Sequence, residues 1–538
     1  MSSESNTNTK SDSNNGGVKI NVTQETIDGV VWEVVKEGEG SIRKMKDLSK
    51  EAFYNPIQEF NRDISIALVN LFSRRVSEGK DSPAEDKEGT RGLVKSASEE
   101  RKKRGGITVF EGLAATGLRS MRYAKEIKGL SRIYANDIDP CAVESIRRNA
   151  EFNKLSEGII EATQGDASAH MYAHSHSTDQ RFDVIDIDPF GSPAQFLDSA
   201  VQAIAEGGLL CVTFTDMAVL CGPHSDVCFT KYGSVPIRRG YGHEEALRIG
   251  LYTIQQHASR YRRYVVPVLC FSIDYYIRIF VRVYTSPGKV NAIANNFSYL
   301  LQCVSCPTHY FQPLAKIEKG SPFTAARFEC PAACEHCGSR LMIGGPIWTG
   351  PIHDPAWVRE LVDYVSGLPE NVYPNTRKRI IGVLSAILDE LHEVPLFVTM
   401  DDLCHTFKLS MPQKYVVENA FAQAKFKLSV SHTDPQAIKT DAPMDFVYAV
   451  LRAWAVEKGM KMPDPSTPAG KLLQNATKFE VDIKAAIEAK KPEKPKVPRF
   501  LPNPAENWGP GTKGGKKRAN TQQQQQQKKK PKTEEPAK

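Results

Sequence analysis

The chain of 538 residues lacks any apolar run that approaches the ~18 uncharged residues needed to cross a bilayer, so we expect no membrane-spanning segment. Residues 1–17 are rich in Ser and Asn, and they lack both the apolar stretch of a secretory signal and the Arg-rich pattern of a mitochondrial transit peptide. Without such a signal, the 11 cysteines indicate a reducing compartment, and therefore thiols or metal ligands rather than disulfides.

Excess positive charge is absent from most of the chain. Residues 490–538 contain 14 Lys and Arg against four Asp and Glu, a net charge of +10, whereas the whole chain carries +7. Residues 1–489 therefore sum to −3, and a nucleic-acid surface on this part must be a local patch. The basic end is also rich in Pro, Gly and Gln, a composition that cannot bury a core and indicates a solvated, disordered tail.

Shifts in composition and apolar periodicity divide the chain into four parts: a flexible arm, an α/β core with a charged insertion, a cysteine-bearing segment and the basic tail. The boundaries are residues 1–17, 18–287 with the insertion at 76–106, 288–488 and 489–538. Near the end of the core, two apolar runs at 264–270 and 276–284 predict an antiparallel edge on a mostly parallel sheet.

The tetrapeptide Asp188-Pro189-Phe190-Gly191 is the most informative feature of the chain. It follows the apolar run 182–187, which predicts a buried strand, and ligands of open α/β sheets collect at the carboxyl ends of strands. A carboxylate at that place accepts N–H bonds from an exocyclic amino group, and the following aromatic ring can lie flat on an unstacked base. The alternative is that Asp188 caps the next helix, with Pro189 at its start.

Three further strand patterns precede this one. Residues 107–110 lead into a small-residue turn and a helix, the order of a nucleotide-binding βα unit. The next strand ends at Asp137, 20 residues after Gly117, a spacing suited to a carboxylate that binds ribose hydroxyls. A third ends beside Asp166, which can accept a hydrogen bond from an adenine amino group. A plain βα turn explains each unit alone, but three acids at four strand ends favour a nucleotide-type ligand.

Two cysteine pairs have the spacing of a metal site. Cys303 and Cys306 are separated by 27 residues from Cys334 and Cys337, and four thiolates suit tetrahedral zinc with no open position for chemistry. Cys330 and His336 are competing ligands, and chance pairing or a redox pair are the alternatives. We expect structural zinc that holds a small subdomain together.

The turn 111–117, the acids Asp137 and Asp166, and the Asp188 tetrapeptide resemble class I S-adenosylmethionine methyltransferases that act on amino nitrogens. More narrowly, residues 18–454 resemble the eukaryotic tRNA guanine-26 N2-dimethyltransferase family. The motifs are Phe53-Tyr54-Asn55-Pro56, Phe60-Asn61-Arg62-Asp63, Ala115-Thr116-Gly117-Leu118-Arg119 and Tyr241-Gly242-His243-Glu244-Glu245. One departure is that Ala114 and Ala115 stand where glycines are usual, so the turn alone does not separate this cofactor from a dinucleotide.

The resemblance implies a Rossmann-like core that binds S-adenosylmethionine, and a smaller, zinc-bearing α+β C-terminal domain that binds tRNA. The implied reaction is transfer of one or two methyl groups to the exocyclic N2 of guanine 26 in tRNA. The implied catalytic residues are Asp188, Pro189 and Phe190, and the implied cofactor contacts are Arg62, Arg119, Asp137, Asp166 and Ala167. The family also implies a cysteine cluster, which leaves the choice between Cys330 and Cys334 open.

Two other functions compete with this interpretation. An amino methyltransferase acting on DNA also uses Asp-Pro-aromatic motifs, but the segment 60–63 and the cysteine pairs argue against it. A non-catalytic RNA-binding protein on a methyltransferase core is the second, and the intact acids at the strand ends argue against that. We further expect a monomer in the nucleus, with the alternatives of an additional cytoplasmic or mitochondrial pool.

The basic tail yields a first prediction. Its clusters at 516–518 and 528–532 are typical of nuclear-import and nucleic-acid patches, while residues 500–504 and Trp508 are apolar enough to dock on the body. Truncation after Pro510 is expected to leave thermal stability and zinc content unchanged, to weaken tRNA affinity mainly at low salt, and to move the protein from nucleus to cytoplasm. Imaging in cells checks the location, and filter binding checks the tRNA affinity. Nuclear retention of the truncated chain would refute the role of the tail in nuclear import. Loss of activity at saturating tRNA would show that the tail is part of the catalytic fold.

Overall fold

The computed structural model describes residues 21–27, 29–45, 54–80, 90–318, 321–373, 375–475, 478–491 and 497–504. The expected N-terminal arm, residues 81–89 of the expected insertion, Phe53, Trp508 and both lysine clusters of the tail lie outside the described residues. Among the described residues, none of the helices combines the length and the apolar character that crossing a membrane requires.

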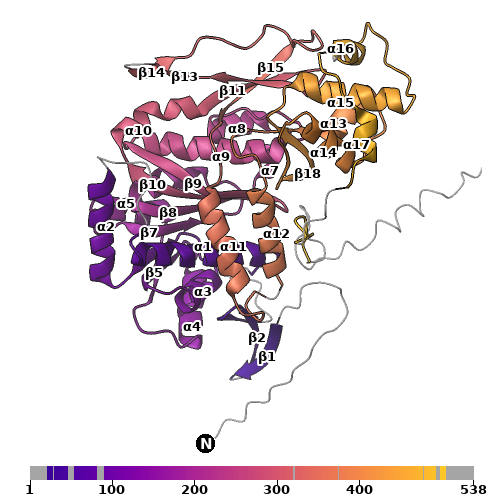
Figure 1. Cartoon of the computed structure of the whole chain (residues 1–538). Helices are drawn as coiled ribbons and strands as arrows, with labels where there is room; N and C mark the ends of the chain where they lie inside the picture. The colour runs from indigo at the N-terminus through magenta and orange to yellow at the C-terminus, as the bar shows by residue number, and fades with distance from the viewer. Residues whose placement is uncertain are drawn as a thin grey trace, which may run out of the picture.

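A seven-stranded sheet forms the centre of the molecule (Figure 1). Its strands, in spatial order, are β6 (Ile160–Gln164), β5 (Leu130–Asp137), β4 (Ile107–Glu111), β7 (Phe182–Ile187), β8 (Ile204–Phe214), β10 (Tyr276–Thr285) and β9 (Arg263–Ile273). The first five strands are parallel, and β10 runs antiparallel to both β8 and β9. The expected α/β class and the antiparallel edge are both confirmed.

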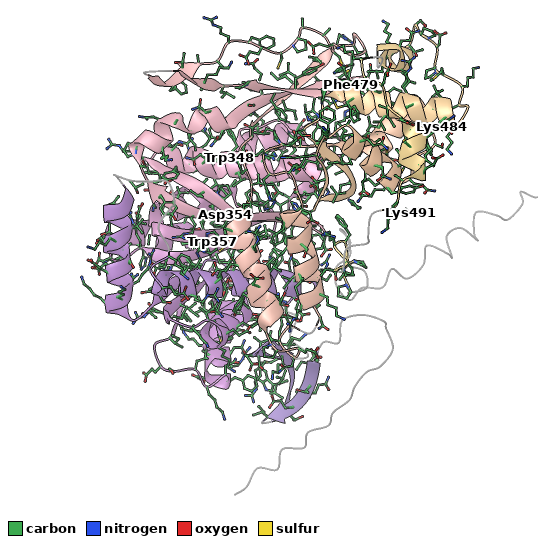
Figure 2. All side chains as sticks on the ribbon, viewed as in Figure 1. Trp348, Asp354, Trp357, Phe479, Lys484 and Lys491 are labelled. Atoms are coloured by element: carbon green, nitrogen blue, oxygen red, sulfur yellow. The ribbon has the colours of Figure 1, made fainter. Side chains whose placement is uncertain are left out.

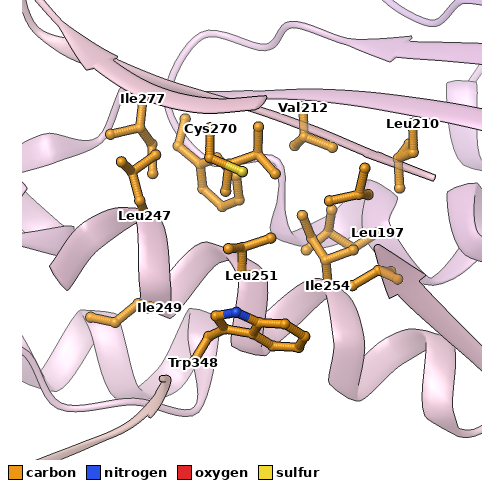
Figure 3. Close-up of a cluster of buried hydrophobic side chains, with 14 of the residues drawn as sticks. Leu197, Leu210, Val212, Leu247, Ile249, Leu251, Ile254, Cys270, Ile277 and Trp348 are labelled. Carbon is orange, nitrogen blue, oxygen red and sulfur yellow. The ribbon is translucent and has the colours of Figure 1, made fainter. Parts of the chain in front are cut away.

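Helices cover both faces of this sheet because its central strands are apolar on both sides. In β4, Val109 packs toward one face and Phe110 toward the other, as the two-residue period of a strand requires. One face is covered by α5 (Ala167–Ser175), α6 (Leu197–Ala203) and α9 (Gly242–Ser259), and the other by α1 (Glu59–Ser77), α11 (Pro355–Gly367) and α12 (Arg377–Leu388). Figure 3 shows part of the first layer, in which Leu251 and Ile254 lie close to Trp348.

A small antiparallel sheet precedes the core. It consists of β1 (Asn21–Ile27), β2 (Val30–Glu37) and β3 (Gly40–Met45), and β3 packs on α3 (Leu118–Glu126) and α4 (Pro140–Phe152). The last residue of β2, Glu37, is buried and forms ion pairs with Arg62 and Arg122.

The second half of the expected charged insertion is not only a surface segment. Residues 90–104 form α2 (Thr90–Arg104), which packs on β8 and β10. Its Val94 side chain is buried, and the Arg101 guanidinium donates to the buried Asp183 carboxylate over 2.6 Å. The charge in this helix therefore includes a cation that the sheet requires, which a sequence count cannot distinguish from solvated lysines.

The C-terminal part contains a second sheet and a helical lobe. β11 (Phe297–Cys303) lies between β12 (His309–Pro313) and β15 (Leu341–Trp348), and the hairpin β13 (Ala315–Glu318) with β14 (Ser321–Ala325) is adjacent in the chain. The lobe, orange to yellow in Figure 1, has its own apolar core that includes the paired cysteines. Its elements are β16 (Val398–Thr399), α13 (Met400–Phe407), α14 (Lys414–Gln423), β17 (Leu428–Ser431), β18 (Asp434–Thr440), α15 (Met444–Glu457), α16 (Pro468–Asn475) and α17 (Ile483–Glu488).

The start of the tail is docked on the body, as expected for residues 500–504. The Arg379 guanidinium on α12 donates to the Leu501 carbonyl over 3.1 Å, and Asn503 donates to Asp274 over 2.7 Å. Gly382 allows this contact, because a Cβ there would lie 2.4 Å from the Pro498 carbonyl oxygen.

A buried cluster of charges joins the core to the C-terminal lobe. Glu244 on α9 accepts hydrogen bonds from Arg248 and from Lys439 of β18, and Lys439 also lies 3.4 Å from Glu390. Burial alone would raise the pKa of Glu244, but Lys439 and Arg248 outweigh burial and lower it to about 2. The core and the C-terminal lobe therefore meet through buried charges, since Lys439 of the lobe is paired with Glu244 of the core.

The Lys439→Met variant is expected to lose about 3–5 kcal/mol of stability, because buried carboxylates lose a partner. Lys414→Met is the control: that side chain is 61% exposed, and we expect under about 0.5 kcal/mol. The folded pKa of Glu244 lies below 4.5, so its contribution is present above about pH 4.5 and is lost as the pH falls toward about 2. Urea unfolding at several pH values checks both points, and equal stability of the two variants would contradict the role of Lys439.

Candidate active site and metal centre

The turn after β4 crosses the carboxyl ends of the parallel strands. Its conformation requires two residues in the left-handed region, Ala115 at φ 48° and Gly117 at φ 75°. The Ala115 N–H donates to the Asp137 carboxylate over 2.8 Å, so the turn is tied to the end of β5. A Cβ on Gly117 would lie 3.0 Å from Ile146, which shows why this position favours glycine although Ala is tolerated two residues earlier.

Asp137 and Asp166 stand at neighbouring strand ends, as the sequence predicts. Asp137 is half-buried and also accepts from the Asp139 N–H over 3.0 Å. Asp166 is exposed and caps α5 by accepting from the Ala169 N–H over 2.9 Å, and the buried Ala167 begins that helix. Both acids therefore shape the loops that surround them, and they share one edge of the sheet because Asp137 is paired in register with Gln164.

Asp188 follows β7 directly and caps no helix, since helical structure resumes only at Ala194. Its Oδ2 accepts a hydrogen bond from Asn61 over 3.3 Å and a short one from the Arg119 guanidinium. Oδ1 accepts none from the described part of the chain. The alternative interpretation of Asp188 as a helix cap is therefore excluded.

The loop after Asp188 presents an aromatic ring to solvent. Pro189 is buried, whereas the Phe190 side chain is 84% exposed. Gly191, at φ 91°, is fixed by a hydrogen bond from its N–H to the Thr215 hydroxyl over 2.6 Å and by the Thr215 N–H over 3.0 Å. A large apolar side chain on a fixed loop beside a carboxylate is a surface that suits a flat ring.

Arg119 lies at the centre of several carboxyl groups. In addition to Asp188, its guanidinium lies 3.2 Å from Asp186 and 3.6 Å from Glu111. Asp186 also accepts from Arg278 over 2.8 Å; burial would raise its pKa, but Arg119 and Arg278 lower it. For Glu111 burial prevails, and it raises the pKa to about 8. One cation thus orders three carboxyl groups at two neighbouring strand ends, those of β4 and β7.

Arg62 is also buried, and its position differs from that of Arg119. Its guanidinium binds both oxygens of Glu37, over 2.6 and 2.5 Å, and donates to the Asn55 carbonyl over 3.0 Å. Neither arginine is a surface ion pair, since Arg62 is 7% and Arg119 5% exposed. Both residues therefore belong to buried networks of paired charges.

Three residues near this edge were not singled out from the sequence. Asn61 contacts Asp188, and it was visible only as part of a motif. Ile138 follows Asp137 and is 68% exposed. In the sequence, the only indication of a role at the site is that an apolar residue directly follows the acid at a strand end. Nothing in the sequence indicates that Glu37 pairs with Arg62, because the two residues are 25 positions apart and their contact depends on the N-terminal sheet.

The four paired cysteines converge as the spacing predicts. Cys303, Cys306, Cys334 and Cys337 are buried, and their Sγ atoms all lie within 4.8 Å of one another. Three Sγ–Sγ distances are 3.4, 3.6 and 3.8 Å, and tetrahedral zinc with bonds of ~2.3 Å requires about 3.8 Å. Cys330 is not in this group, and His336 is paired with Asp445 over 2.9 Å. The donor set therefore fits zinc with Cys334 rather than Cys330.

Tight turns at both pairs support this arrangement. The Ser305 N–H lies 3.4 Å from Cys303 Sγ, and the Gly338 N–H donates to the Cys334 carbonyl over 2.8 Å with Gly338 at φ 71°. Zinc held here would tie the end of β11 to the loop that precedes β15. The C-terminal lobe packs against this centre, and its Tyr448 shares a hydrogen bond with Thr308 over 2.6 Å. The metal centre would take no part in chemistry at the strand ends, because four thiolates leave no coordination position for substrate.

Comparison with known proteins identifies relatives of the whole arrangement. The family model described as N2,N2-dimethylguanosine tRNA methyltransferase matches residues 31–452. The tRNA (guanine(26)-N(2))-dimethyltransferase 1 of Arabidopsis thaliana is 37% identical, with 90% of this chain and 88% of the relative covered. The mitochondrial tRNA (guanine(26)-N(2))-dimethyltransferase of Saccharomyces cerevisiae is 32% identical, with 91% and 93% covered.

A solved structure is similar as well. It is described as the complex of Trm1 from Pyrococcus horikoshii with S-adenosyl-L-methionine, and it shares 26% identity and a TM-score of 0.60 with this chain. The similarity covers 77% of this chain and 98% of that one.

For the metal centre, we expect one zinc per chain, and loss of zinc with aggregation when any of the four paired cysteines is replaced by Ser. Cys330→Ser is the matched control and is expected to retain full zinc, since Cys330 lies outside the group. Elemental analysis of freshly purified protein, without chelator, checks both. Protein free of zinc, or a Cys330→Ser protein that has lost it, would overturn this assignment.

Proposed function

The chain belongs to the N2,N2-dimethylguanosine tRNA methyltransferase family, and from this we propose that its strand-end site methylates the exocyclic N2 of guanine 26 in tRNA. The chain is an S-adenosylmethionine-dependent enzyme, and one or two transfers give N2-methyl- or N2,N2-dimethylguanosine. The observation that carries the residue assignment is the pair formed by Asp188, held on one oxygen by Arg119, and the exposed ring of Phe190.

Asp188 orients the amine. Arg119 and Asn61 both bind Oδ2, so Oδ1 is left to accept an N–H of the guanine amine, and the fixed loop limits where that amine can lie. The amine lone pair is delocalised into the guanine ring, so orientation and exclusion of water are the main tasks of the protein. The cofactor, when bound, supplies an electrophilic sulfonium methyl group. Asp188, or water beside it, receives the proton that the amine releases.

Phe190 binds the base. A base within a folded tRNA must leave its stack to reach a strand-end crevice, and an exposed aromatic ring compensates by stacking on the displaced base. Pro189 completes this group, because its fixed φ and the restriction on the residue before it hold Asp188 and Phe190 apart on a rigid backbone.

The cofactor lies, in this proposal, along the edge formed by the ends of β4, β5 and β6. Asp137 binds the ribose hydroxyls, Asp166 and the Ala167 N–H read the adenine edge, and Ile138 packs on the adenine ring. Arg119 and Arg62 bind the methionine carboxylate. Arg119 is well placed for this, whereas Arg62 must release one of its two bonds to Glu37.

The remaining proposals concern assembly and address. We also propose that the protein acts as a monomer. The C-terminal part from residue 288 binds tRNA, although α11 and α12 within it pack on the core. We place the protein in the nucleus on the lysine clusters of the tail; a mitochondrial relative makes an additional mitochondrial pool the alternative. The relatives' names do not favour the DNA-methylating or the non-catalytic alternative.

Asp188→Ala is expected to reduce single-turnover methyl transfer by about 10²–10⁴-fold while cofactor and tRNA still bind, because a positioned acid–base group is lost. Asp188→Asn keeps the shape and is expected to be nearly as inactive, since the amide lacks the charge that Arg119 and the amine share. Mass spectrometry of nucleosides from undermodified tRNA gives the rates. Asp226→Ala, an exposed aspartate on α8 (Ser225–Tyr232), is the control. A near wild-type rate for Asp188→Ala would remove Asp188 from the mechanism.

A further inference from the structure

A cavity of about 620 Å³ lies outside the proposed active site. It is bounded by the first half of β9, by the end of α10 (Pro287–Ala292) with the following 3₁₀ turn, and by the loop that links β15 to α11. Trp348 and Asp354, both labelled in Figure 2, belong to its wall. The adjoining part of β9, Val265–Pro267, is paired through β10 with the middle of β8, so the cavity is set back from the carboxyl ends where Asp188 stands.

Polar atoms without partners converge on this cavity. His353 Nε2, both ring nitrogens of His392 and Asn295 Oδ1 are buried and find no hydrogen-bond partner among the described residues, and all three residues line the cavity. His353 is only 4% exposed. A buried polar group left unpaired is costly, so several of them around one cavity, from three separate segments, indicate a binding site.

The hydrogen-bonding roles of these atoms follow from their neighbours. The Cys270 N–H points at His353 Nδ1 over 3.4 Å, which places the His353 proton on Nε2 as a donor. Asn295 Nδ2 donates to the Ala292 carbonyl over 2.8 Å, which leaves Oδ1 as an acceptor. Burial lowers the pKa of both histidines, and for His353 the neighbouring His432, His392, Lys439 and Arg248 lower it further. A neutral His392 offers one donor and one acceptor.

A metal ion is the first occupant to consider, because His353, Glu390 and His432 lie within 4.8 Å of one another. However, His432 already uses Nδ1 toward Glu390 over 2.6 Å and Nε2 toward the Ser272 N–H over 3.3 Å. The charges of Glu390 and Glu244 are balanced by Lys439 and Arg248. A divalent cation would add an uncompensated charge to this buried cluster, so electrostatics disfavours it.

We propose that the cavity is a second binding site, for an uncharged, planar heterocycle of the nucleobase type. Its walls are largely apolar, with Pro351, Ile293 and Val266 among them, and its unpaired atoms include both donors and acceptors. Base edges carry donors and acceptors side by side, which matches neutral imidazoles and an amide. Lys289 is the one cationic residue in the lining, and the carboxylates of Asp354 and Glu393 offset its charge, so the lining offers a phosphate no net positive charge. The base comes either from a free nucleoside or from an unstacked nucleotide of bound RNA; the second source rests on the proposed function.

The direct test is calorimetric titration of the full chain with each of the four ribonucleosides, with the cofactor site filled by saturating S-adenosylhomocysteine. At least one nucleoside is expected to bind, and His392→Phe and Asn295→Leu are each expected to weaken it about tenfold or more, because a buried hydrogen bond is lost. His392→Gln keeps a donor and an acceptor and is expected to bind within a few fold of wild type. His405→Phe, an exposed histidine on α13, is the control.

The source of the base is decided by tRNA affinity. If the base belongs to bound RNA, His392→Phe and Asn295→Leu are expected to weaken tRNA binding, while the rate of methyl transfer at saturating tRNA stays unchanged. If the site takes a free nucleoside, both variants are expected to bind tRNA as the wild type does, and added nucleoside does not compete with tRNA. Asp188→Ala leaves this cavity intact. Nucleoside binding by that variant therefore tests the second site independently of the proposed methyl transfer. No nucleoside binding together with unaltered tRNA affinity would overturn the proposal, and so would a second metal equivalent that is lost in His353→Phe.

Discussion

The ion pairs of Arg119 are the interaction on which the strand-end site depends. A guanidinium that is 5% exposed is tolerated only because Asp186 and Asp188 lie against it, and those carboxylates are tolerated near a buried edge only because of it and Arg278. Loss of Arg119 would leave Asp188 without a cation and Asp186 with Arg278 alone, a costly change at a buried edge. The same cation fixes which oxygen of Asp188 faces outward, so the stability of this edge and the geometry of the proposed chemistry have one cause.

Buried ion pairs also join the distant parts of the molecule to the core. The N-terminal sheet joins the core through Glu37, which meets both Arg62 and Arg122, and the C-terminal lobe joins it through Lys439 and Glu244. These junctions pair charges that are all nearly inaccessible, and apolar layers on both faces of the sheet surround them. Charged contacts of this kind contribute little net stability compared with apolar packing, but they allow few alternative arrangements of the parts. The four paired cysteines, whose arrangement fits zinc, provide a further link within the C-terminal part.

The features predicted correctly from the sequence are those with a local cause. Apolar runs gave the strands, and strand ends placed Asp137, Asp166 and Asp188 at one edge, because the carboxyl ends of parallel strands must meet there. Cysteine spacing likewise predicted that the four paired thiols converge. The partner of Arg62, the buried role of Arg101 in a charged segment and the exclusion of Cys330 could not be predicted, because each depends on which distant residues the fold brings near. Periodicity describes a segment, whereas ion pairing depends on the whole fold.

Arg119 couples cofactor binding to base binding in the proposed complex. In the proposed complex, Arg119 serves both the methionine carboxylate and Asp188, so a single guanidinium is shared by the groups that hold the two substrates. A cofactor carboxylate that attracts this guanidinium weakens its bond to Asp188 Oδ2 and leaves Asn61 as the remaining anchor of that oxygen. The carboxylate of Asp188 then becomes a stronger acceptor for the guanine amine, because less of its charge is neutralised. Binding of the cofactor and readiness of the base-binding carboxylate are thereby coupled through one side chain, without any movement of the strands that carry them.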